Sequence, residues 1–267
     1  MSTQLEQILA HTLLEVTRRK CSADMPALER LAIAHQPRGF NVALRSAAAQ
    51  GPAIIAEIKK ASPSRGLIRA DFRPRDLAPN LQAAGAAALS VLTDTEFFQG
   101  SLADLEAASA AVTIPCLRKD FILDPFQILE SRAAGADAIL LIVAALTDGK
   151  LRLLHDFASD LGLDVLVETH DRTEIDRAVQ LGSKIIGVNS RDLRSFTVKT
   201  ESLLALAQTL PPDVLRVAES GIRSAADIAS LRSSGYQAFL VGEALMRQPE
   251  PAAALALLLD RQYSQDI

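Results

Sequence analysis

Charged side chains follow short apolar runs along this 267-residue chain. The members best suited to proton transfer are two lysines and three glutamates: Glu57, Lys59, Lys119, Glu168 and Glu219. Neighbouring Lys and Glu side chains hold each other's charge and shift each other's pKa, as general acid–base catalysis requires. A lone lysine after a strand is usually only solvated. Several ionisable groups at equivalent places are costly unless they have a function, so the pattern predicts a catalytic site.

Two glycine-containing turns favour a phosphate site near these groups. They follow the last two apolar runs and comprise Glu219-Ser220-Gly221 and Gly242-Glu243. Glycine lets the backbone approach an anion, and N–H groups at a helix N-terminus bind phosphate. Glu243 should offer only its N–H, because its carboxylate would repel phosphate. The alternative is a pair of tight turns. The basic, hydroxyl-bearing segment 59–66 is likewise either a phosphate-gripping loop or a simple turn.

The elements that must position these groups form a regular series. Eight β-type runs are separated by helix-patterned segments, at 53–58, 87–92, 114–118, 138–143, 165–167, 185–188, 215–218 and 238–241. Strands that alternate with helices favour a parallel sheet, and a count of eight favours its closure. The sequence therefore predicts an α/β fold, a (β/α)8 TIM barrel with its chemistry at the carboxyl ends of the strands.

The N-terminal segment precedes the first run. Residues 1–50 have two stretches with helical apolar spacing, punctuated by Pro26 and Pro37, and predict a helical extension. It either plugs one end of the barrel or helps to close the active-site mouth. No Pro/Gly/Ser-rich linker divides the chain, so residues 1–267 are expected to form one domain.

Bulk properties narrow the function class. The chain is 49% hydrophobic and 22% charged, with a net charge of −4. Its basic residues are scattered, which disfavours nucleic-acid binding. We expect no membrane association and no signal peptide, because the chain lacks an apolar run of about 18 residues and a basic N-terminal region before an apolar one. Cys21 and Cys116 are far apart, so a cytoplasmic protein is predicted.

No set of metal ligands is evident in the sequence. His170 lies two residues after Glu168, and this pair is the one conceivable metal site, which we disfavour. A dinucleotide fingerprint after the first run and a nucleophile elbow are both missing. We therefore expect no cofactor and no metal. The residues alone predict acid–base chemistry on a small phosphate-bearing substrate, and they leave the reaction open.

Several segments resemble the signatures of one family, indole-3-glycerol phosphate synthase. They are IAEIKKASPSRG (55–66), SVLTD (90–94), FQGS (98–101), RKDF (118–121), VE (167–168), GVNSRDL (187–193), AESGI (218–222) and FLVGEALM (239–246). The resemblance covers essentially the whole chain, including RGF at 38–40, and each block lies at a predicted strand end. Blocks in the right order are far more specific than any single block.

The resemblance implies a reaction in tryptophan biosynthesis. The substrate would be 1-(2-carboxyphenylamino)-1-deoxyribulose 5-phosphate, and the products indole-3-glycerol phosphate, CO2 and water. Lys119 would be the general acid at the ketone oxygen. Lys59 would hold the anthranilate carboxylate and is a second candidate donor for the dehydration. Glu168 would be the base or proton shuttle for the loss of water. Which lysine serves which step stays open.

The resemblance also implies roles for the remaining site residues. Glu57 and Asn189 would bind the sugar hydroxyls and orient the lysines, and Glu219 and Ser220 would complete the catalytic set. The implied substrate-binding residues have three roles. The phosphate ligands would be Ser62, Gly221, Gly242 and Glu243. The aromatic ring would lie in an apolar slot of Phe98, Phe121 and Leu140, and Arg191 would be a cation near the mouth. Some members have Ser in place of Glu243.

Two other functions stay open at this point. A phosphoribosylanthranilate isomerase would use a Cys at the first strand and an Asp at the seventh, where this chain has Glu57 with Lys59 and Glu219. A non-catalytic phosphate-binding barrel could keep Gly221 and Gly242 and lose Lys119 or Glu168, but both are present. The sequence does not fix the oligomeric state, and a monomer is the working expectation.

Overall fold

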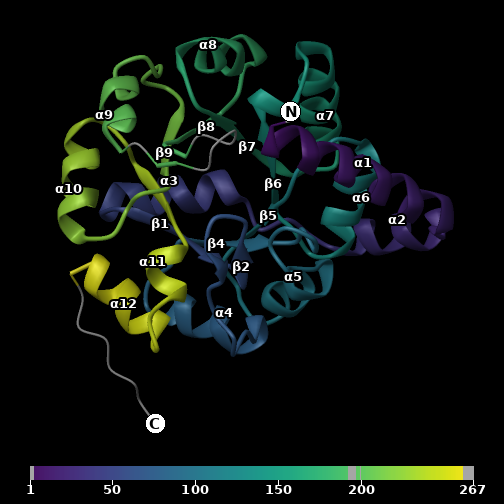
Figure 1. Cartoon of the computed structure of the whole chain (residues 1–267), viewed down its shortest axis with the longest axis horizontal. Coiled ribbons are helices and arrows are strands. Elements are labelled where there is room, and N and C mark those ends of the chain that lie inside the picture. The colour runs from purple at the N-terminus through teal and green to yellow at the C-terminus, as the bar shows by residue number, and fades with distance from the viewer. Residues whose placement is uncertain (1–2, 192–196, 199, 261–267) are drawn as a thin grey trace.

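Eight parallel strands close into a barrel in the computed structural model, which describes residues 3–191, 197, 198 and 200–260. In chain order the barrel strands are β1 (Ala53–Ile58), β4 (Ala88–Leu92), β5 (Cys116–Lys119), β6 (Ala138–Ile142), β7 (Asp164–Thr169), β8 (Ile185–Asn189), β9 (Leu215–Glu219) and β10 (Ala238–Val241). Each strand pairs with the next, and β10 pairs with β1 (Figure 1). The predicted (β/α)8 barrel is confirmed.

Helices surround the barrel; most connect successive strands, and α11 and α12 follow the last strand (Figure 1). They are α4 (Pro74–Ala83), α5 (Leu102–Ser109), α6 (Pro125–Ala133), α7 (Asp148–Asp160), α8 (Arg172–Leu181), α9 (Glu201–Ala207), α10 (Ala225–Ser233) and α12 (Pro251–Leu258), with the short η1 (Val143–Ala145) and α11 (Glu243–Met246). Several begin at a side chain that caps the first turn, such as Ser101, Asp124, Asp171 and Ser224. These caps fix where each helix starts after its strand.

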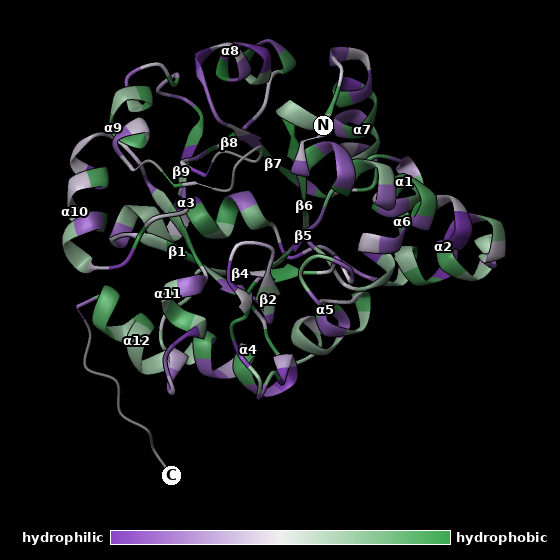
Figure 2. Cartoon of the chain, viewed as in Figure 1, coloured by the Kyte–Doolittle hydropathy of each residue, from purple (hydrophilic) through white to green (hydrophobic). Residues whose placement is uncertain are grey.

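The strands are apolar because both of their faces are buried. In β1, Ile54, Ala56 and Ile58 pack against the helices, whereas Ala53 and Ile55 face the barrel interior. All of these side chains are buried. Figure 2 shows the hydrophobic residues concentrated on the strands and the hydrophilic ones on the outer helix surfaces. Two-sided burial explains why the strand signal is a continuous apolar run.

The N-terminal extension consists of α1 (Gln4–Ser22), α2 (Met25–Ala34) and α3 (Phe40–Gln50). Phe40 and Leu44 of α3 are buried in the interior cluster that holds the first residues of β1 and β10. Helix α3 therefore closes the N-terminal end of the barrel. Helix α1 reaches toward the other end, where His11 meets Phe97 after β4 edge-on at 5.6 Å.

The structure refines some sequence boundaries. The third run was predicted at 114–118, but β5 spans Cys116–Lys119 and so includes Lys119. Segment 59–66 contains part of a small hairpin, β2 (Ala61–Ser62) with β3 (Gly66–Leu67). Asp192 and Leu193 of the family-like segment 187–193 lie outside the described residues. Among the helices that the structure describes, none is long and apolar enough to cross a membrane.

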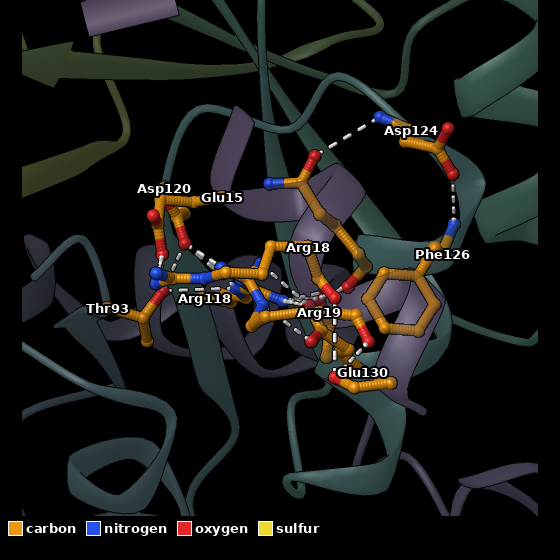
Figure 3. Close-up of polar contacts among 12 residues, drawn as sticks. Glu15, Arg18, Arg19, Thr93, Arg118, Asp120, Asp124, Phe126 and Glu130 are labelled. Atoms are coloured by element: carbon orange, nitrogen blue, oxygen red, sulfur yellow. Dashed lines mark hydrogen bonds and ion pairs between the residues drawn. The ribbon is translucent and has the colours of Figure 1, made fainter. Parts of the chain in front are cut away.

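A buried ion-pair network joins the extension to β5 (Figure 3). Arg19 of α1 donates to both carboxylate oxygens of Glu130 on α6, at 2.9 and 3.1 Å. Glu130 also lies 3.5 Å from Nη1 of Arg118, whose Nη2 donates to Asp120 at 2.8 Å. Thr93, after β4, donates to the same Asp120 oxygen at 2.6 Å. Because Arg118 and Asp120 flank Lys119, this network fixes the strand end that carries the lysine.

Arg19→Met should lower the free energy of unfolding by about 1–2 kcal/mol, toward the low end for hydrogen bonds to a charged group because Arg19 is partly exposed. Arg18→Met is the matched control, since Arg18 pairs with Glu15 of the same helix and its side chain is 74% exposed. Urea unfolding of both variants measures the difference. An equal decrease in the free energy of unfolding of both variants would show that the Arg19–Glu130 pair stabilises the protein no more than an exposed ion pair.

Candidate active site

The period of two along a strand sends the predicted catalytic residues into the barrel. In β5, Leu117 faces the interior, so Lys119 also does. Likewise Leu166 and Glu168 share the inner face of β7, and Val217 and Glu219 share that of β9. Each charged residue is the last inward position of its strand. The carboxyl ends of parallel strands meet at one mouth, which brings these side chains together.

Lys119 lies at the centre of this group. Its Nζ donates to Oε2 of Glu168 at 2.9 Å and lies 3.6 Å from Oε2 of Glu219. Both glutamate side chains are 1% exposed, and that of Lys119 is 13% exposed. A buried ammonium is tolerated only beside compensating charge. Lys119 is thus a protonated donor that points into the barrel mouth.

The charges in this cluster shift one another's pKa in opposite directions. Burial alone would lower the pKa of Lys119, but the carboxylates of Glu168, Glu219 and Glu57 outweigh it and raise that pKa. Burial alone would raise the pKa of Glu168, but Lys119 and His170 outweigh it and lower that pKa well below its ordinary value. Lys119 and Glu168 therefore form a charged pair over the whole neutral range.

Glu219 is in a different state although it touches the same lysine. Burial, followed by the negative charge of Glu168, raises the pKa of Glu219 to about 8. Within the described residues neither of its carboxylate oxygens has a hydrogen-bond partner. Two carboxylates that share one cation cannot both ionise cheaply, so one of them holds a proton. Glu219 is that carboxyl at neutral pH.

A second lysine–glutamate pair stands beside the first. Lys59 donates to Oε1 of Glu57 at 2.5 Å, and both side chains are largely buried. Burial alone would raise the pKa of Glu57, but the charges of Lys59, Lys119 and Arg191 outweigh it and lower that pKa. Asn189 ends β8 and accepts the backbone N–H of Arg191 at 3.0 Å. The mouth therefore presents two ammonium groups with anchored carboxylates.

The predicted phosphate turns line the same mouth as Ser62. Ser220 and Gly221 have φ of 67° and 77°, so the backbone turns through the left-handed region there. The carboxylate of Glu243 is turned toward arginines: it lies 3.1 Å from Arg65, 3.1 Å from Arg247 and 3.7 Å from Arg191. Cations thus neutralise the residue that sequence reasoning identified as an awkward phosphate neighbour.

An apolar slot lies on the opposite part of the mouth from the charged turns. The rings of Phe98 and Phe121 are 6.5 Å apart and tilted by 41°, and Leu140 is buried beside them on the inner face of β6. Every site residue predicted from the sequence lines one cavity of about 940 Å³. The cavity combines paired cations and carboxylates with an apolar surface, as a site for a small charged aromatic compound would.

Sequence reasoning missed two residues that shape this site. Gly187, in the interior of β8, lies against Glu219, and a Cβ there would collide with Oε1 of that side chain. A glycine inside a strand is the signal that could have revealed this close approach. His170 contacts Glu168, with its Nε2 3.4 Å from Oε1. It was considered only as a metal ligand, yet no group of three His, Cys, Asp or Glu in the described part of the chain could hold a metal ion.

These observations define a class of protein: a (β/α)8-barrel enzyme with lysine–carboxylate pairs at the carboxyl end of the barrel. The family model described as indole-3-glycerol phosphate synthase matches residues 5–258. The chain is 58% identical to the indole-3-glycerol phosphate synthase of Koribacter versatilis, over 97% of this chain and 100% of that one. It is 50% identical to that of Acidithiobacillus ferrooxidans, over 96% and 98%.

A solved structure of 3-hexulose-6-phosphate synthase superposes with a TM-score of 0.63 at 17% identity, over 78% of this chain and 98% of that one, which supports the barrel fold. The sequence matches over nearly the full length decide which family of barrel proteins includes this chain. The chain belongs to the indole-3-glycerol phosphate synthase family.

Gly187→Ala should displace Glu219 and lower the synthase rate on the order of 100-fold, since a shift of about 1 Å in a catalytic group has such effects. Gly149→Ala in α7 is the control, because a Cβ there meets nothing within 4 Å. Steady-state kinetics measures both variants. If Gly187→Ala kept the wild-type rate, the position of the Glu219 side chain would not matter for turnover.

Glu219 should also make stability fall with rising pH. Its pKa is about 8 in the folded state and near 4.5 when unfolded, so the folded chain binds an extra proton between these values. The free energy of unfolding then falls as pH rises through that window. Urea unfolding from pH 5 to 8 should show a flatter dependence for Glu219→Gln. Parallel curves for variant and wild type would contradict the raised pKa.

Proposed function

We propose that this chain converts 1-(2-carboxyphenylamino)-1-deoxyribulose 5-phosphate to indole-3-glycerol phosphate, CO2 and water. The family it belongs to comprises decarboxylating lyases of tryptophan biosynthesis. In this reaction the ring carbon that bears the carboxylate attacks the ketone. The carboxylate leaves as CO2, and loss of water then completes the indole. The substrate is a small phosphorylated molecule with an aromatic ring, which fits the cavity chemistry.

Ring closure places negative charge on the ketone oxygen, which needs a proton. Lys119 is the proposed donor, because its ammonium is buried and points into the cavity. A cation preorganised at a developing alkoxide also stabilises the transition state electrostatically. Lys59, held by Glu57, is the proposed partner of the substrate carboxylate until CO2 leaves. The two lysines thus divide between the ketone and the carboxylate.

Loss of water requires a base for the carbon-bound proton and an acid for the departing hydroxyl. Glu168 is the proposed base because it is an anion at neutral pH. Glu219 carries a proton in the same pH range and lies 3.6 Å from Lys119, so it can supply or replenish the acid. Glu168 as the base and Glu219 as the acid, both beside Lys119, therefore supply the two proton transfers that dehydration requires.

Binding contacts follow from the remaining cavity residues. Ser62 and the backbone at Gly221, Gly242 and Glu243 are the proposed phosphate ligands, and Arg191 is a nearby cation. Glu57, Asn189 and Ser220 are proposed to contact the ribulose hydroxyls. The ring is proposed to lie in the apolar slot of Phe98, Phe121 and Leu140. Because one chain supplies all of these groups, we propose a monomer as the active unit.

The setting of the enzyme is also a proposal. Both cysteines are free thiols, and that of Cys21 is exposed, which suits the reducing cytoplasm. The net charge of −4 does not favour binding to nucleic acid, which is itself negatively charged. Neither nucleic acid nor membrane is therefore proposed as a partner.

One observation carries the proposed function: the buried ammonium of Lys119 is held between two glutamates in a cavity lined by every predicted site residue. An isomerase that uses a Cys at the first strand is disfavoured, because β1 contains Glu57 near its end and Lys59 directly follows the strand. A non-catalytic barrel is disfavoured because a desolvated lysine–carboxylate cluster is costly to keep without chemistry.

Turnover of the proposed substrate should appear as a rise in indole fluorescence, against a low background because the chain has no tryptophan. We expect the rise to persist with EDTA. Lys119→Met should lower kcat by about 10²- to 10⁴-fold, the contribution of a positioned proton donor. Lys184→Met, at an exposed position, is the control.

Three other results would revise the proposal. Wild-type turnover in Lys119→Met would remove the general-acid assignment. Substrate binding without any product would support a non-catalytic barrel. Failure of the substrate to bind, measured by calorimetry, would mean that the substrate is misassigned.

A further inference from the structure

His170 links the active site to the protein surface. It follows β7, and its Nε2 lies 3.4 Å from Oε1 of Glu168. Neither of these two atoms makes a hydrogen bond within the described structure, so the contact between them is an ion pair. On its other side, Nδ1 of His170 lies 3.0 Å from Oε2 of Glu174 in the first turn of α8. The ring is held between two carboxylates.

This contact makes the two glutamates on Lys119 unequal. Glu168 has a cationic partner on each oxygen, Lys119 at 2.9 Å and His170 at 3.4 Å. Among the described residues, the one cationic partner of Glu219 is Lys119, at the longer distance of 3.6 Å. Both carboxyls are equally buried, and each is the last inward-facing residue of its barrel strand. Lys119 already favours Glu168 by its shorter distance, and His170 adds a second cation on Glu168.

We propose that His170 is a positioning residue that assigns the proton between the two buried glutamates, keeping Glu168 as the anion and leaving the proton on Glu219. The assignment rests on the proposed function, in which Glu168 is the base and Glu219 the acid. His170 itself does not line the cavity, so it acts through Glu168 and not on substrate.

The ring acts as a fixed cation and not as a relay. Burial alone would lower the pKa of His170, but Glu168 and Glu174 outweigh it and raise that pKa to about 10. The imidazolium therefore stays protonated through the neutral range. The charged groups that face the cluster are Glu174 on α8, Lys119 on β5, Glu57 on β1 and Glu219 on β9. Glu57 adds negative charge near Glu219, which further favours the proton there.

His170→Gln removes the charge while an amide can still donate a hydrogen bond. We expect the acidic limb of the kcat profile to move up by about 1–3 pH units, the effect of losing an opposite charge at this distance. At pH 7 kcat should fall about twofold, with KM nearly unchanged, because two nearly equivalent carboxyls would each hold the shared proton for about half of the time. His155→Gln on α7 is the matched control, because His155 lies beside Asp156 and outside the cavity.

Results of other kinds would overturn the assignment. A fall in kcat with an unmoved acidic limb would reduce His170 to a structural role. An unchanged rate and profile would remove it from the mechanism.

Two measurements on the substrate-free protein keep the inference separate from the proposed function. Nitrogen NMR of the imidazole should show His170 with both nitrogens protonated at pH 8. Infrared spectra at pH 7 should show a carboxylic-acid band in wild type that Glu219→Gln removes. A neutral His170, or spectra of wild type and Glu219→Gln that do not differ, would overturn the inference even if the enzyme turned substrate over.

Glu174→Gln provides a second variant if His170→Gln does not fold. It removes the outer carboxylate and leaves the Glu168–His170 contact in place. The pKa of His170 should fall, and the acidic limb should move in the same direction as in His170→Gln but less far. An intact substrate-free signature with no turnover would instead count against the proposed substrate and leave the proton assignment standing.

Discussion

A buried ammonium group is the constraint on which this site depends. Lys119 can remain charged inside the barrel because the ionised carboxylates of Glu168 and Glu57 lie near it, with the carboxyl of Glu219 beside them. Without the lysines, burial of those carboxylates would in turn strongly destabilise the folded protein. The lysines and glutamates therefore stabilise one another as a group, and the barrel brings them together from separate strands.

Closure of the sheet makes this arrangement possible. An open sheet would spread the strand ends along an edge, whereas the barrel turns them toward one axis, and the period of two places alternate residues inside. The same period sends Arg118 outward, into the network with Asp120 and Glu130. One strand end thus carries a charged residue for the site on its inner face and an anchor for the extension on its outer face.

The sequence was sufficient for the fold and for the charged residues at the strand ends, because both follow from local pattern. The apolar slot, Ser62 and Arg191 were instead implied by the resemblance to a family. Continuous apolar runs indicate two-sided burial, and polar residues after such runs must meet where the barrel opens. The protonation states were not predictable. Whether Glu168 or Glu219 is ionised depends on which cations approach each oxygen across strands, and neither residue type nor spacing contains that information. Two of the arginines on Glu243, Arg65 and Arg191, escaped prediction for the same reason, since they come from distant parts of the chain.

The proton assignment also bears on how one site can serve two successive steps. Ring closure needs an acid at the ketone oxygen, and dehydration needs a base as well as a second proton. Two identical carboxyls around one lysine could exchange their proton freely, and the site would then be wrong for either step part of the time. A fixed cation on one side of Glu168 removes that degeneracy. This cation is itself stabilised outside the cavity, because Glu174 lies 3.0 Å from Nδ1 of His170. Acid and base are thereby separated by environment and not by residue type.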